Sequence, residues 1–517
     1  MMTSKSQLAE ALHLFNSKKF EAANLVLCRL IEIDLKNFEA FNLLGAIALI
    51  EKKYSLAEAN FIKALEINPR YSGAWSNLTS AYRQQQKFEN ALKASEQAVA
   101  LNPLQVEPWL NQANTYYDLG FLQKALEAYK RILELEPTHF QALVNAGRVL
   151  LDQNLAELSL PFYARALQIS RADADIWVNY GICQHRLNLL EEAIKSFDQA
   201  LAMDQFHHKA NYNKSLVLLK QGKYSEGWPL YEARFCIDER IFRRHTEIPE
   251  LGDIKQVFGK NILVWVEQGF GDSIQFSRYI ELLIQNGACV FLQLQDGLEK
   301  LMLDSFPKAK LLDENSLRKV DYQISLLSLP RIFSTTLDNI PSHTPYLTVD
   351  PQKAGAWKSK LGNKTKARIG LSWFGNSAQK DDAQRSLDLH LLTPLLDLPF
   401  EFHSLHKEYR PQDTEILCKT PQIIDHHLDL QDFSDTAALM NEMDLVISVC
   451  TSLAHLSGAL DKSTILLLHW NSDWRWLIQR RSSPWYRSFR LYRQTFQGDW
   501  VDTLDLVAQD LKKTLTS

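Results

Sequence analysis

A strand-to-helix junction in the second half of the chain carries a carboxylate where a ligand can approach the backbone. The junction reads EQGFGDS and lies at the end of an apolar run over residues 261–268. Gly269 and Gly271 allow a tight turn and a close approach of the backbone to a bound donor molecule. We expect Asp272 at the carboxyl edge of a sheet, where it could accept a proton from an acceptor hydroxyl. The alternative is a structural role, in which Asp272 caps the helix together with Ser273; the two roles are compatible.

The same junction partly matches a dinucleotide-binding fingerprint, which would indicate a nicotinamide oxidoreductase. Asp296 stands roughly where a ribose-binding acid is expected. However, Ile274 occupies the third glycine position, and Asp272 would place negative charge where a pyrophosphate should lie. The oxidoreductase therefore stays an alternative that this junction supports only in part.

A second junction offers hydrogen-bond donors to a phosphate. In the segment LVISVCTSLAHLSGAL, an apolar run ends at Val449, and Cys450, Thr451 and Ser452 precede a helical pattern. Unpaired backbone N–H groups and hydroxyls at a helix start predict a site for a nucleotide phosphate. His455 lies one turn into this helix and could contact the phosphate or the sugar, or else serve as a core or capping residue.

A polar loop after the expected strand 367–373 could complete the donor site. It carries Asn376, Lys380, Arg385 and Ser386. Lys380 or Arg385 could neutralise a leaving diphosphate, whereas the alternative is a solvated loop.

A fourth segment, DWRW, places Trp474 and Arg475 after an apolar run. An arginine between two tryptophans suggests stacking on a base or a sugar, or else packing at an interface.

The elements that must hold these residues are expected to form an α/β fold. Apolar β-type runs alternate with helical patterns, which favours βα units and a mainly parallel sheet. We expect a linker over 241–258, an acceptor-side lobe over 259–352 and a nucleotide-sugar lobe over 353–517, both Rossmann-like. The expected strands lie at 261–268, 288–295, 367–373, 401–406, 421–427, 445–450 and 463–470, and the expected helices include 273–285 and 433–443.

The first half of the chain repeats with a period of 34 residues. Pro69, Pro103 and Pro137 fall on this step, and a column of mostly aromatic residues keeps the same step. The members of that column are Phe41, Trp75, Trp109, Leu143 and Trp177. The pattern matches the tetratricopeptide repeat, a helical hairpin that buries its apolar face only by stacking on its neighbours. We expect an α-solenoid over residues 1–240, with six clear units and a seventh that closes the array.

An asparagine column recurs two positions after the aromatic column, on the first helix of each hairpin. A ladder of carboxamides on the concave surface could hold an extended peptide backbone whatever its side chains. The alternative is a local hydrogen-bonding role common to this repeat. The column resembles the asparagine ladder of the O-linked N-acetylglucosamine transferases. Its members are Asn77, Asn111, Asn145, Asn179 and Asn213.

Charge and composition narrow the range of partners. The 517-residue chain has a net charge of −4 and a pI near 6.4, which argues against nucleic acid as a main partner. No run approaches the roughly 18–20 apolar residues of a membrane span, and the N-terminus lacks the apolar core of a signal peptide. Six scattered cysteines without a CxxC pair fit a reducing cytoplasm.

Four motifs in order resemble the C-terminal domain of tetratricopeptide-repeat glycosyltransferases. They are EQGFGDSIQFSRYI, GLSWFGN with RSL, FSDTAALMNEMDLVISVCTSLAHLSGAL, and DWRWL with SPWY. That domain is similar to the heptosyltransferase family of bacterial lipopolysaccharide synthesis. The resemblance implies a two-lobed GT-B fold and inverting, metal-independent transfer from a nucleotide sugar, with no further cofactor. It also implies Asp272 as the base and Thr451, Ser452 and His455 in the donor-phosphate segment, but Cys450 stands where an aspartate is usual.

The layout of repeats followed by a transferase resembles enzymes that glycosylate flagellin in the cytoplasm before export. It implies a protein acceptor captured by the repeats. The Cys450 departure supports the alternative function, a non-catalytic adaptor whose second half is a degenerate transferase.

Overall fold

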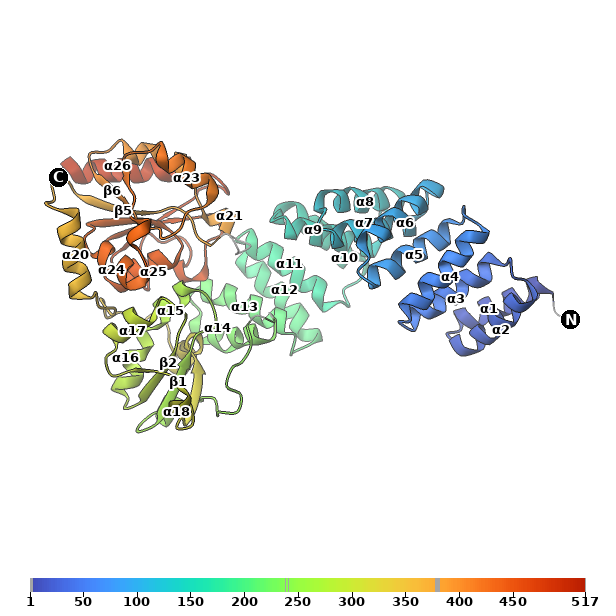
Figure 1. Cartoon of the computed structure of the whole chain (residues 1–517), viewed down its shortest axis with the longest axis horizontal. Helices are drawn as coiled ribbons and strands as arrows, with labels where there is room; N and C mark the ends of the chain where they lie inside the picture. The colour runs from blue at the N-terminus through green and yellow to red at the C-terminus, as the bar shows by residue number, and fades with distance from the viewer. Residues whose placement is uncertain (1–2, 238, 240, 377–381, 517) are drawn as a thin grey trace. The chain divides into compact units, whose positions relative to one another are not determined.

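The computed structural model describes residues 3–237, 239, 241–376 and 382–516, without the side chains of 514–516. The chain forms two compact units, Met1–Asp204 and Gln205–Ser517. Figure 1 shows the first unit as helices only and the second as helices with two sheets.

The first unit is a solenoid of paired helices. Each first helix has 13 residues and each second helix has 14, and the two helices of a hairpin pack together. The helices are α1 Ser4–Asn16, α2 Phe20–Ile33, α3 Phe38–Ile50, α4 Tyr54–Ile67, α5 Ser72–Gln84, α6 Phe88–Leu101, α7 Val106–Asp118, α8 Leu122–Leu135, α9 Phe140–Asp152, α10 Ala156–Ile169, α11 Ala174–Arg186 and α12 Leu190–Met203.

One backbone position in every hairpin turn adopts a left-handed conformation. It recurs at a step of 34 residues, and its φ angles lie between 58° and 79°. Gly120 and Gly222 adopt this conformation without penalty. Elsewhere the position holds a lysine, a glutamine or an asparagine, so the sharp turn is imposed by the packed helices on either side. The non-glycine residues are Lys18, Lys52, Gln86, Asn154 and Asn188.

Buried aromatic rings fill the inside of the hairpins. Phe61, Tyr129, Tyr163 and Phe197 are fully buried. The three tryptophans of the aromatic column have a different role: they are half-buried, and each indole N–H donates to a carbonyl six residues earlier. The bonds are Trp75 Nε1 to Pro69 O at 2.9 Å, Trp109 Nε1 to Pro103 O at 2.9 Å, and Trp177 Nε1 to Arg171 O at 3.2 Å.

The second unit begins with a seventh hairpin, formed by α13 (His208–Lys220) and α14 (Tyr224–Tyr231). A 3-10 turn, η1 (Glu232–Cys236), follows α14. The repeat pattern that the sequence extends to residue 240 therefore runs into the second unit, which starts at Gln205.

The first sheet has four parallel strands in the order β3-β2-β1-β4. Its central strand β1 pairs with β2 on one side and β4 on the other, and helices follow the strands. The elements are β1 Asn261–Trp265, α15 Phe270–Phe276, α16 Arg278–Gln285, β2 Cys289–Gln293, α17 Glu299–Ser305, β3 Lys310–Leu311, α18 Glu314–Leu317, β4 Tyr322–Ser325 and α19 Leu329–Ile332.

The second sheet has six parallel strands in the order β10-β9-β8-β5-β6-β7. β5 and β9 are buried along their whole length, as expected for a parallel sheet covered on both faces. The elements are α20 Pro351–Leu361, β5 Arg368–Ser372, α21 Asp382–Arg385, α22 Thr393–Leu396, β6 Glu401–Ser404, α23 Pro411–Cys418, β7 Ile423–Ile424, α24 Phe433–Asn441, β8 Leu445–Val449, α25 Ser452–Ala459, β9 Thr464–Leu468, β10 Phe489–Arg493 and α26 Val501–Thr516.

Each strand expected from the sequence is present, somewhat shorter than its apolar run. The helix expected over 273–285 is two helices, α15 and α16, which meet at Ser277. α15 also begins three residues before the expected helix, so Asp272 lies within its first turn.

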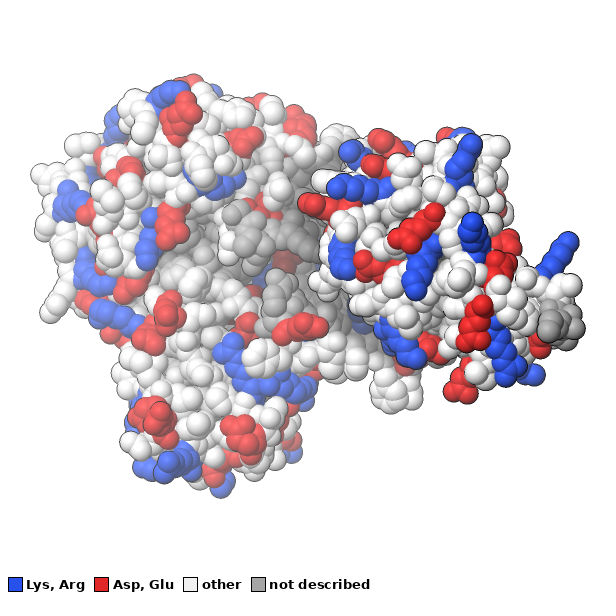
Figure 2. All heavy atoms as spheres, turned by 45° about the vertical axis from the view of Figure 1, so that its right-hand side comes forward, with Lys and Arg blue, Asp and Glu red and all other residues white. Residues whose placement is uncertain are grey.

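Charge is evenly distributed over the visible surface. In Figure 2, lysine and arginine alternate with aspartate and glutamate, and no extended region of one sign covers the described part of that face. No helix in the described part of the chain is both long and apolar enough to span a membrane.

Candidate functional site

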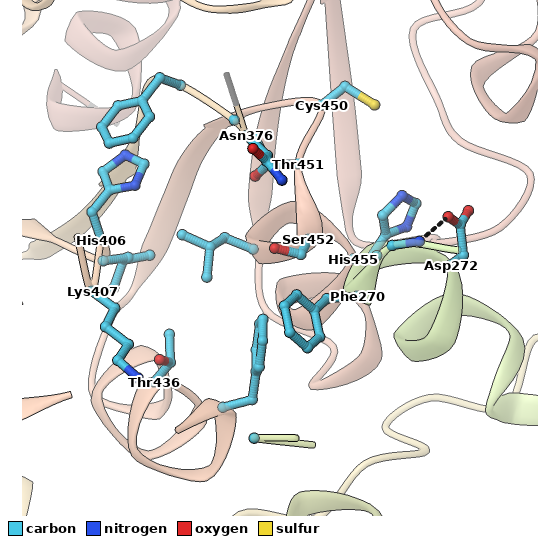
Figure 3. Close-up of a pocket in the computed structure, with 18 of the residues that line it drawn as sticks. Phe270, Asp272, Asn376, His406, Lys407, Thr436, Cys450, Thr451, Ser452 and His455 are labelled. Atoms are coloured by element: carbon cyan, nitrogen blue, oxygen red, sulfur yellow. Dashed lines mark hydrogen bonds between the residues drawn. The ribbon is translucent and has the colours of Figure 1, made fainter. Parts of the chain in front are cut away.

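A cavity of about 640 Å³ lies in the second unit, where the carboxyl ends of both sheets meet. The loops that follow β1, β2, β5, β6, β8 and β9 all contribute to its wall. Parallel α/β sheets bind ligands at this edge. Figure 3 shows Asp272 and His455 on one side, His406 and Lys407 on the other, and Ser452 between them.

Asp272 lines the cavity and also serves its own helix. Its Oδ2 accepts a hydrogen bond from the Gly269 N–H at 3.2 Å, and its Oδ1 accepts one from Arg475 Nη2 at 2.5 Å. Burial raises the pKa of Asp272, and Asp473 adds to this, while Arg475 opposes it. The N-cap of α15 is Gly269 and not Asp272 as expected, but Asp272 serves the helix start from position N3 and also lines the cavity.

Arg475 is the centre of a buried hydrogen-bond network. Its Nη1 donates to both carboxylate oxygens of Asp473, at 3.0 and 3.1 Å, and its Nε donates to Gln275 Oε1 at 2.5 Å. With Asp272 on Nη2, each guanidinium nitrogen has a protein partner. The neighbouring carboxylates raise the pKa of Arg475 against the effect of burial. Arg475 lines the cavity, but its donors are already directed to other side chains.

The start of α25 offers backbone donors to the cavity. Thr451 is the N-cap in an extended conformation, and its side chain makes no capping bond to α25 within the described structure. Its hydroxyl instead lies 3.4 Å from those of Ser372 and Ser448. Because Thr451 and Ser452 both line the cavity, the first turn of α25 is suited to an anion.

His455 is a neutral residue of the cavity wall. Its Nδ1 lies 3.0 Å from Tyr486 Oη, and its ring stacks on Trp476. Burial lowers the pKa of His455 well below its ordinary range, and nearby arginines add to the effect. A Cβ on Gly271 would lie 2.9 Å from His455 Cδ2, so glycine permits the close approach of α15 and α25.

The loop after β5 brings part of the predicted donor set to the cavity. Asn376 and Arg385 line the wall. Arg385 Nη1 donates to the Cys450 carbonyl at 3.1 Å, and its Nε donates to Asp382 at 3.0 Å. Ser386 does not line the cavity: its hydroxyl donates to Asp382 Oδ2 and accepts from the Gly375 N–H.

Lys380 lies outside the described residues. Its expected contact with a diphosphate stays a prediction.

Trp474 corrects one expectation from the sequence. It is only 4% exposed and does not line the cavity. Its indole packs against Trp228, Tyr224 and Trp485. A ring enclosed in this way has no free face on which a base or a sugar could stack.

Two aromatic pairs in the cavity wall were missed from the sequence. Phe374 stacks on His406 with ring centroids 3.8 Å apart, and Phe270 lies 4.9 Å from Phe433. Burial lowers the pKa of His406 to about 3. The available signal was positional, because Phe374 follows the predicted strand 367–373 and His406 is the last residue of the predicted strand 401–406.

Cys450 is a buried neutral thiol. Its Sγ lies 3.1 Å from Trp476 Nε1, which donates to it, and burial raises its pKa to about 11. An aspartate is usual at this position in the family that the sequence resembles, whereas Cys450 carries no charge.

The described residues contain no cluster of three His, Cys, Asp or Glu side chains that could hold a metal ion.

The asparagine column makes hydrogen bonds between repeats. Asn77 Nδ2 donates to Asn42 Oδ1 at 3.0 Å, and Asn111 Nδ2 donates to the carbonyl and the hydroxyl of Ser76. Asn145 Nδ2 donates to Asn114 Oδ1 at 3.2 Å. These partners lie on the preceding first helix, so the column has a structural role of its own.

The last two members of the column differ from the others. Asn179 is half-buried on α11. Asn213 lies in the second unit, and its Nδ2 donates to the Lys209 carbonyl of its own helix at 2.8 Å.

Consecutive first helices contact one another. The pairs α1–α3, α3–α5, α5–α7 and α9–α11 are in contact, and no pair of second helices in the described array comes as close. The first helices, with Asn77 to Asn179, therefore line the inner surface of the array.

The helical repeats match known protein-family models. Family models described as tetratricopeptide repeat match residues 38–71, 74–107, 110–175 and 186–234. The chain contains tetratricopeptide repeats, as the 34-residue period predicts. This class of repeat supports a role in protein interaction.

One curated relative covers more of the chain. Protein FlbA of Caulobacter vibrioides is 26% identical over 343 residues, which cover 60% of this chain and 55% of that protein. The chain thus spans about half the length of this relative.

Solved structures are similar to part of the chain. YrrB, titled a TPR protein with an unusual peptide-binding site, is 20% identical, covers 34% of this chain and 92% of its own, and has a TM-score of 0.32. Pseudomonas aeruginosa pilF is 16% identical, covers 40% and 94%, and has a TM-score of 0.38.

Proposed function

We propose that this chain is a glycosyltransferase that moves a sugar from a nucleotide-sugar donor to a protein acceptor. The observation that carries the proposal is that Asp272 and the start of α25 line one cavity at the carboxyl edges of two parallel sheets. A cavity of about 640 Å³ has the size of a small-molecule site. It combines a carboxylate with donors for an anion, the two features that sugar transfer from a diphosphate requires.

The donor diphosphate would lie against α25. The backbone N–H groups after Thr451 and the hydroxyl of Ser452 would bind its oxygens, and Arg385 would add positive charge. These groups would stabilise the negative charge that builds on the leaving diphosphate. Phe270, which lines the cavity and is 38% exposed, would provide an apolar face for a nucleobase.

Asp272 would accept the proton of the acceptor hydroxyl. The acceptor oxygen would form a bond to the anomeric carbon of the sugar as the bond between that carbon and the diphosphate oxygen breaks. Burial favours proton uptake by raising the pKa of Asp272, and Arg475 keeps the carboxylate ionised until then. One displacement of this kind inverts the anomeric carbon and uses no metal ion.

The repeats would supply the protein acceptor. The carboxamides of Asn111 and Asn145 lie on the inner surface and bond to the neighbouring repeat, so a bound polypeptide would use the remaining acceptor capacity of their oxygens or replace these bonds. An extended polypeptide could bind along this surface through its backbone. Because the layout of the chain resembles that of enzymes that glycosylate flagellin, we propose that flagellin is the acceptor and that it is modified in the cytoplasm.

The first test is a thermal melt of the full chain with nucleotides and nucleotide sugars of uridine, guanosine, adenosine and cytidine. The full chain is needed, because a fragment starting at residue 241 would lack Tyr224 and Trp228, which are part of the core of the second unit. Ligand at a hundredfold its Kd should stabilise the folded state by about 2.7 kcal/mol. We expect one nucleotide class to raise the melting temperature and the others to leave it unchanged.

The matched variant is Asp272→Asn, which keeps the shape of the side chain. We expect it to retain the nucleotide-induced melting shift but to slow transfer of labelled sugar to flagellin by about 10²–10⁴-fold. Undiminished transfer by this variant would refute Asp272 as the base.

The second candidate is an adaptor without catalytic activity. The uncharged Cys450 thiol favours it, because the resembling family has an acid there. A flat nucleotide panel with a cooperative control melt, together with protein capture by the repeats, would support the adaptor and reject the transferase.

A further inference from the structure

The turn that carries Arg475 is held by the seventh hairpin. Trp474, in η6 (Trp474–Trp476), lies among three aromatic residues of α14. The ring centroid of Trp228 is 5.3 Å from that of Trp474, and Tyr224 and Tyr231 follow at 6.2 and 6.5 Å. The other end of the turn is held as well, because the ammonium of Lys220 on α13 donates to Asn471.

The same turn reaches Asp272 through one guanidinium. The guanidinium carbon of Arg475 lies 4.4 Å from the centroid of the Trp474 ring, and its Nη2 donates to Asp272 Oδ1 at 2.5 Å. Asp473 fixes the turn from within, since its Oδ1 accepts both the Arg475 backbone N–H and Nη1. A continuous set of contacts thus runs from α14 through Trp474 and Arg475 to the carboxylate.

We propose that the α13–α14 hairpin positions the Asp272 carboxylate through Trp474 and Arg475, so that Trp474 is a positioning residue of the cavity. The sequence of the hairpin follows the repeat pattern, but in this chain the hairpin holds the candidate base Asp272 in position. The part of the proposal that concerns turnover rests on the proposed function. The placement of Asp272 does not, and it can be measured directly.

The geometry gives a physical reason for this arrangement. A carboxylate with 19% of its side chain exposed needs a fixed cationic partner to remain ionised. An arginine can move over several ångströms unless its plane is held, and here Trp474 on one face and the bond to Gln275 hold it. Removing the indole should loosen the guanidinium without removing its charge.

Several charged and titratable groups surround Asp272 and must be considered in a titration. Arg475 and Asp473 belong to the loop after β9, and Arg385 comes from α21. Tyr212 on α13 and Tyr231 on α14 face it from the hairpin. Both phenols have raised pKa values because they are buried, so neither ionises near neutral pH.

The experiment follows the Asp272 carboxyl carbon by NMR in the full chain labelled with ¹³C-aspartate. The Asp272→Asn variant identifies the signal. We expect Arg475→Gln to raise the apparent pKa of Asp272 by about 1–3 pH units, because an opposite charge is lost. We expect Trp474→Leu to raise it in the same direction by about one pH unit, and Trp474→Phe to restore the wild-type value.

The control variant is Leu283→Ala. Leu283 of α16 is fully buried in the same core and is not one of the residues of the path described above. It should destabilise the unit and leave the Asp272 titration unchanged. An unchanged titration in Trp474→Leu, or an equal change in Leu283→Ala, would overturn the proposal.

If Trp474→Leu does not fold, Trp228→Leu replaces it, because that residue reaches Asp272 through Trp474. We expect a smaller rise in the same direction, and no rise would contradict the proposal. If the chain transfers sugar, the apparent pKa on the acid side of the kcat–pH profile should shift together with the pKa of Asp272 measured by NMR. If the titration responds as expected but no variant transfers sugar, only the proposed function fails.

Discussion

The first six hairpins and the seventh have the same repeat pattern but different surroundings. Ile50 and Lys220 occupy one column of the repeat, five periods apart. The isoleucine on α3 is 50% exposed, whereas the lysine on α13 is 1% exposed. In the array this position faces solvent, and in the seventh hairpin it lies against the α/β part of the second unit. A repeat position therefore specifies the helix and its phase, while the neighbouring structure decides burial.

The second helices differ in the same way. Pro161 and Pro229 occupy one column, yet α10 continues to Ile169 and α14 ends at Tyr231. Proline alone thus does not end the helix. In the seventh hairpin the chain turns so that Arg234 reaches Glu267 and Ser328, which belong to the α/β part, as well as Glu232 of its own turn. Tertiary contacts outweigh helix continuation here.

The largest expected difference concerns tryptophan. Trp228 is 2% exposed in the core of the second unit, whereas Trp109 in the array is half-buried. We expect Trp228→Ala to lower the free energy of unfolding of its unit by about 3–5 kcal/mol. Trp109→Ala should lower that of the array by about 1–2 kcal/mol, because less apolar area is removed from water on folding. Urea unfolding followed by circular dichroism measures both, and equal losses would contradict the comparison.

Two glycines in hairpin turns, Gly120 and Gly222, provide a second test of the comparison between the array and the seventh hairpin. Both have φ near +80°, so alanine adds strain of about 1 kcal/mol at either site. A Cβ on Gly120 meets nothing within 4 Å, whereas one on Gly222 lies 2.6 Å from Leu337 Cδ1. Because the Leu337 side chain is 36% exposed and can rotate away, we expect Gly222→Ala to lose only about 0.5–1 kcal/mol more than Gly120→Ala.

Gly120→Asn is the control, because Asn154 and Asn188 adopt the same conformation in this column. It should be nearly neutral in the same urea unfolding experiment. A loss from Gly120→Asn as large as that from Gly222→Ala would show that the backbone, and not Leu337, decides the outcome.

Lys220 should make the stability of the second unit depend on pH. Burial lowers its pKa from 10.5 to about 7. Between these values the unfolded chain binds a proton that the folded chain does not, so stability rises with pH, by up to about 1.4 kcal/mol per pH unit. Below pH 7 both states are protonated and this contribution to the slope vanishes.

We expect Lys220→Met to reduce the rise of the free energy of unfolding with pH between pH 7 and 9.5, as measured by chemical unfolding. Ile50→Lys is the matched control, since it places a lysine at the same column in a half-exposed position. Ile50→Lys should leave the pH dependence of the free energy of unfolding unchanged. A slope that persists in Lys220→Met would assign the pH dependence to another group.

The asparagine column is expected to affect capture of the acceptor protein more than the stability of the array. Replacing Asn111, Asn145 and Asn179 with alanine should weaken capture of the acceptor protein while the array stays folded. Each lost hydrogen bond between repeats should lower stability by about 0.5–1.5 kcal/mol. Asn213→Ala should leave capture unchanged, because that amide bonds to its own helix. Calorimetric titration with the acceptor measures capture, and equal affinity of the triple variant would remove the ladder hypothesis.

Much of the fold follows from the sequence because its signals are local. The 34-residue step predicts hairpins whose helices contact mainly their neighbours. The apolar runs around β1, β5 and β8 predict buried parallel strands. The break between α15 and α16 was missed, since the apolar pattern passes through Ser277 without interruption.

The candidate site was only partly predictable. Asp272, Thr451 and Ser452 follow strand ends, and parallel strands bring such ends together, so their meeting could be expected. The direction in which Trp474 points was not expected, and neither was the pairing of Phe374 with His406. Both depend on contacts between segments far apart in the chain.

The sequence by itself determined the helices of the repeats, the parallel strands and the placement of Asp272 after β1, because each is encoded by residues near one another in the chain. The tertiary structure decided that the seventh hairpin belongs to the second unit and that Arg475 holds Asp272 instead of facing the cavity freely. The physical reason is burial. Whether a side chain binds a ligand or packs in a core depends on which surfaces meet, and the order of residues along the chain does not record that.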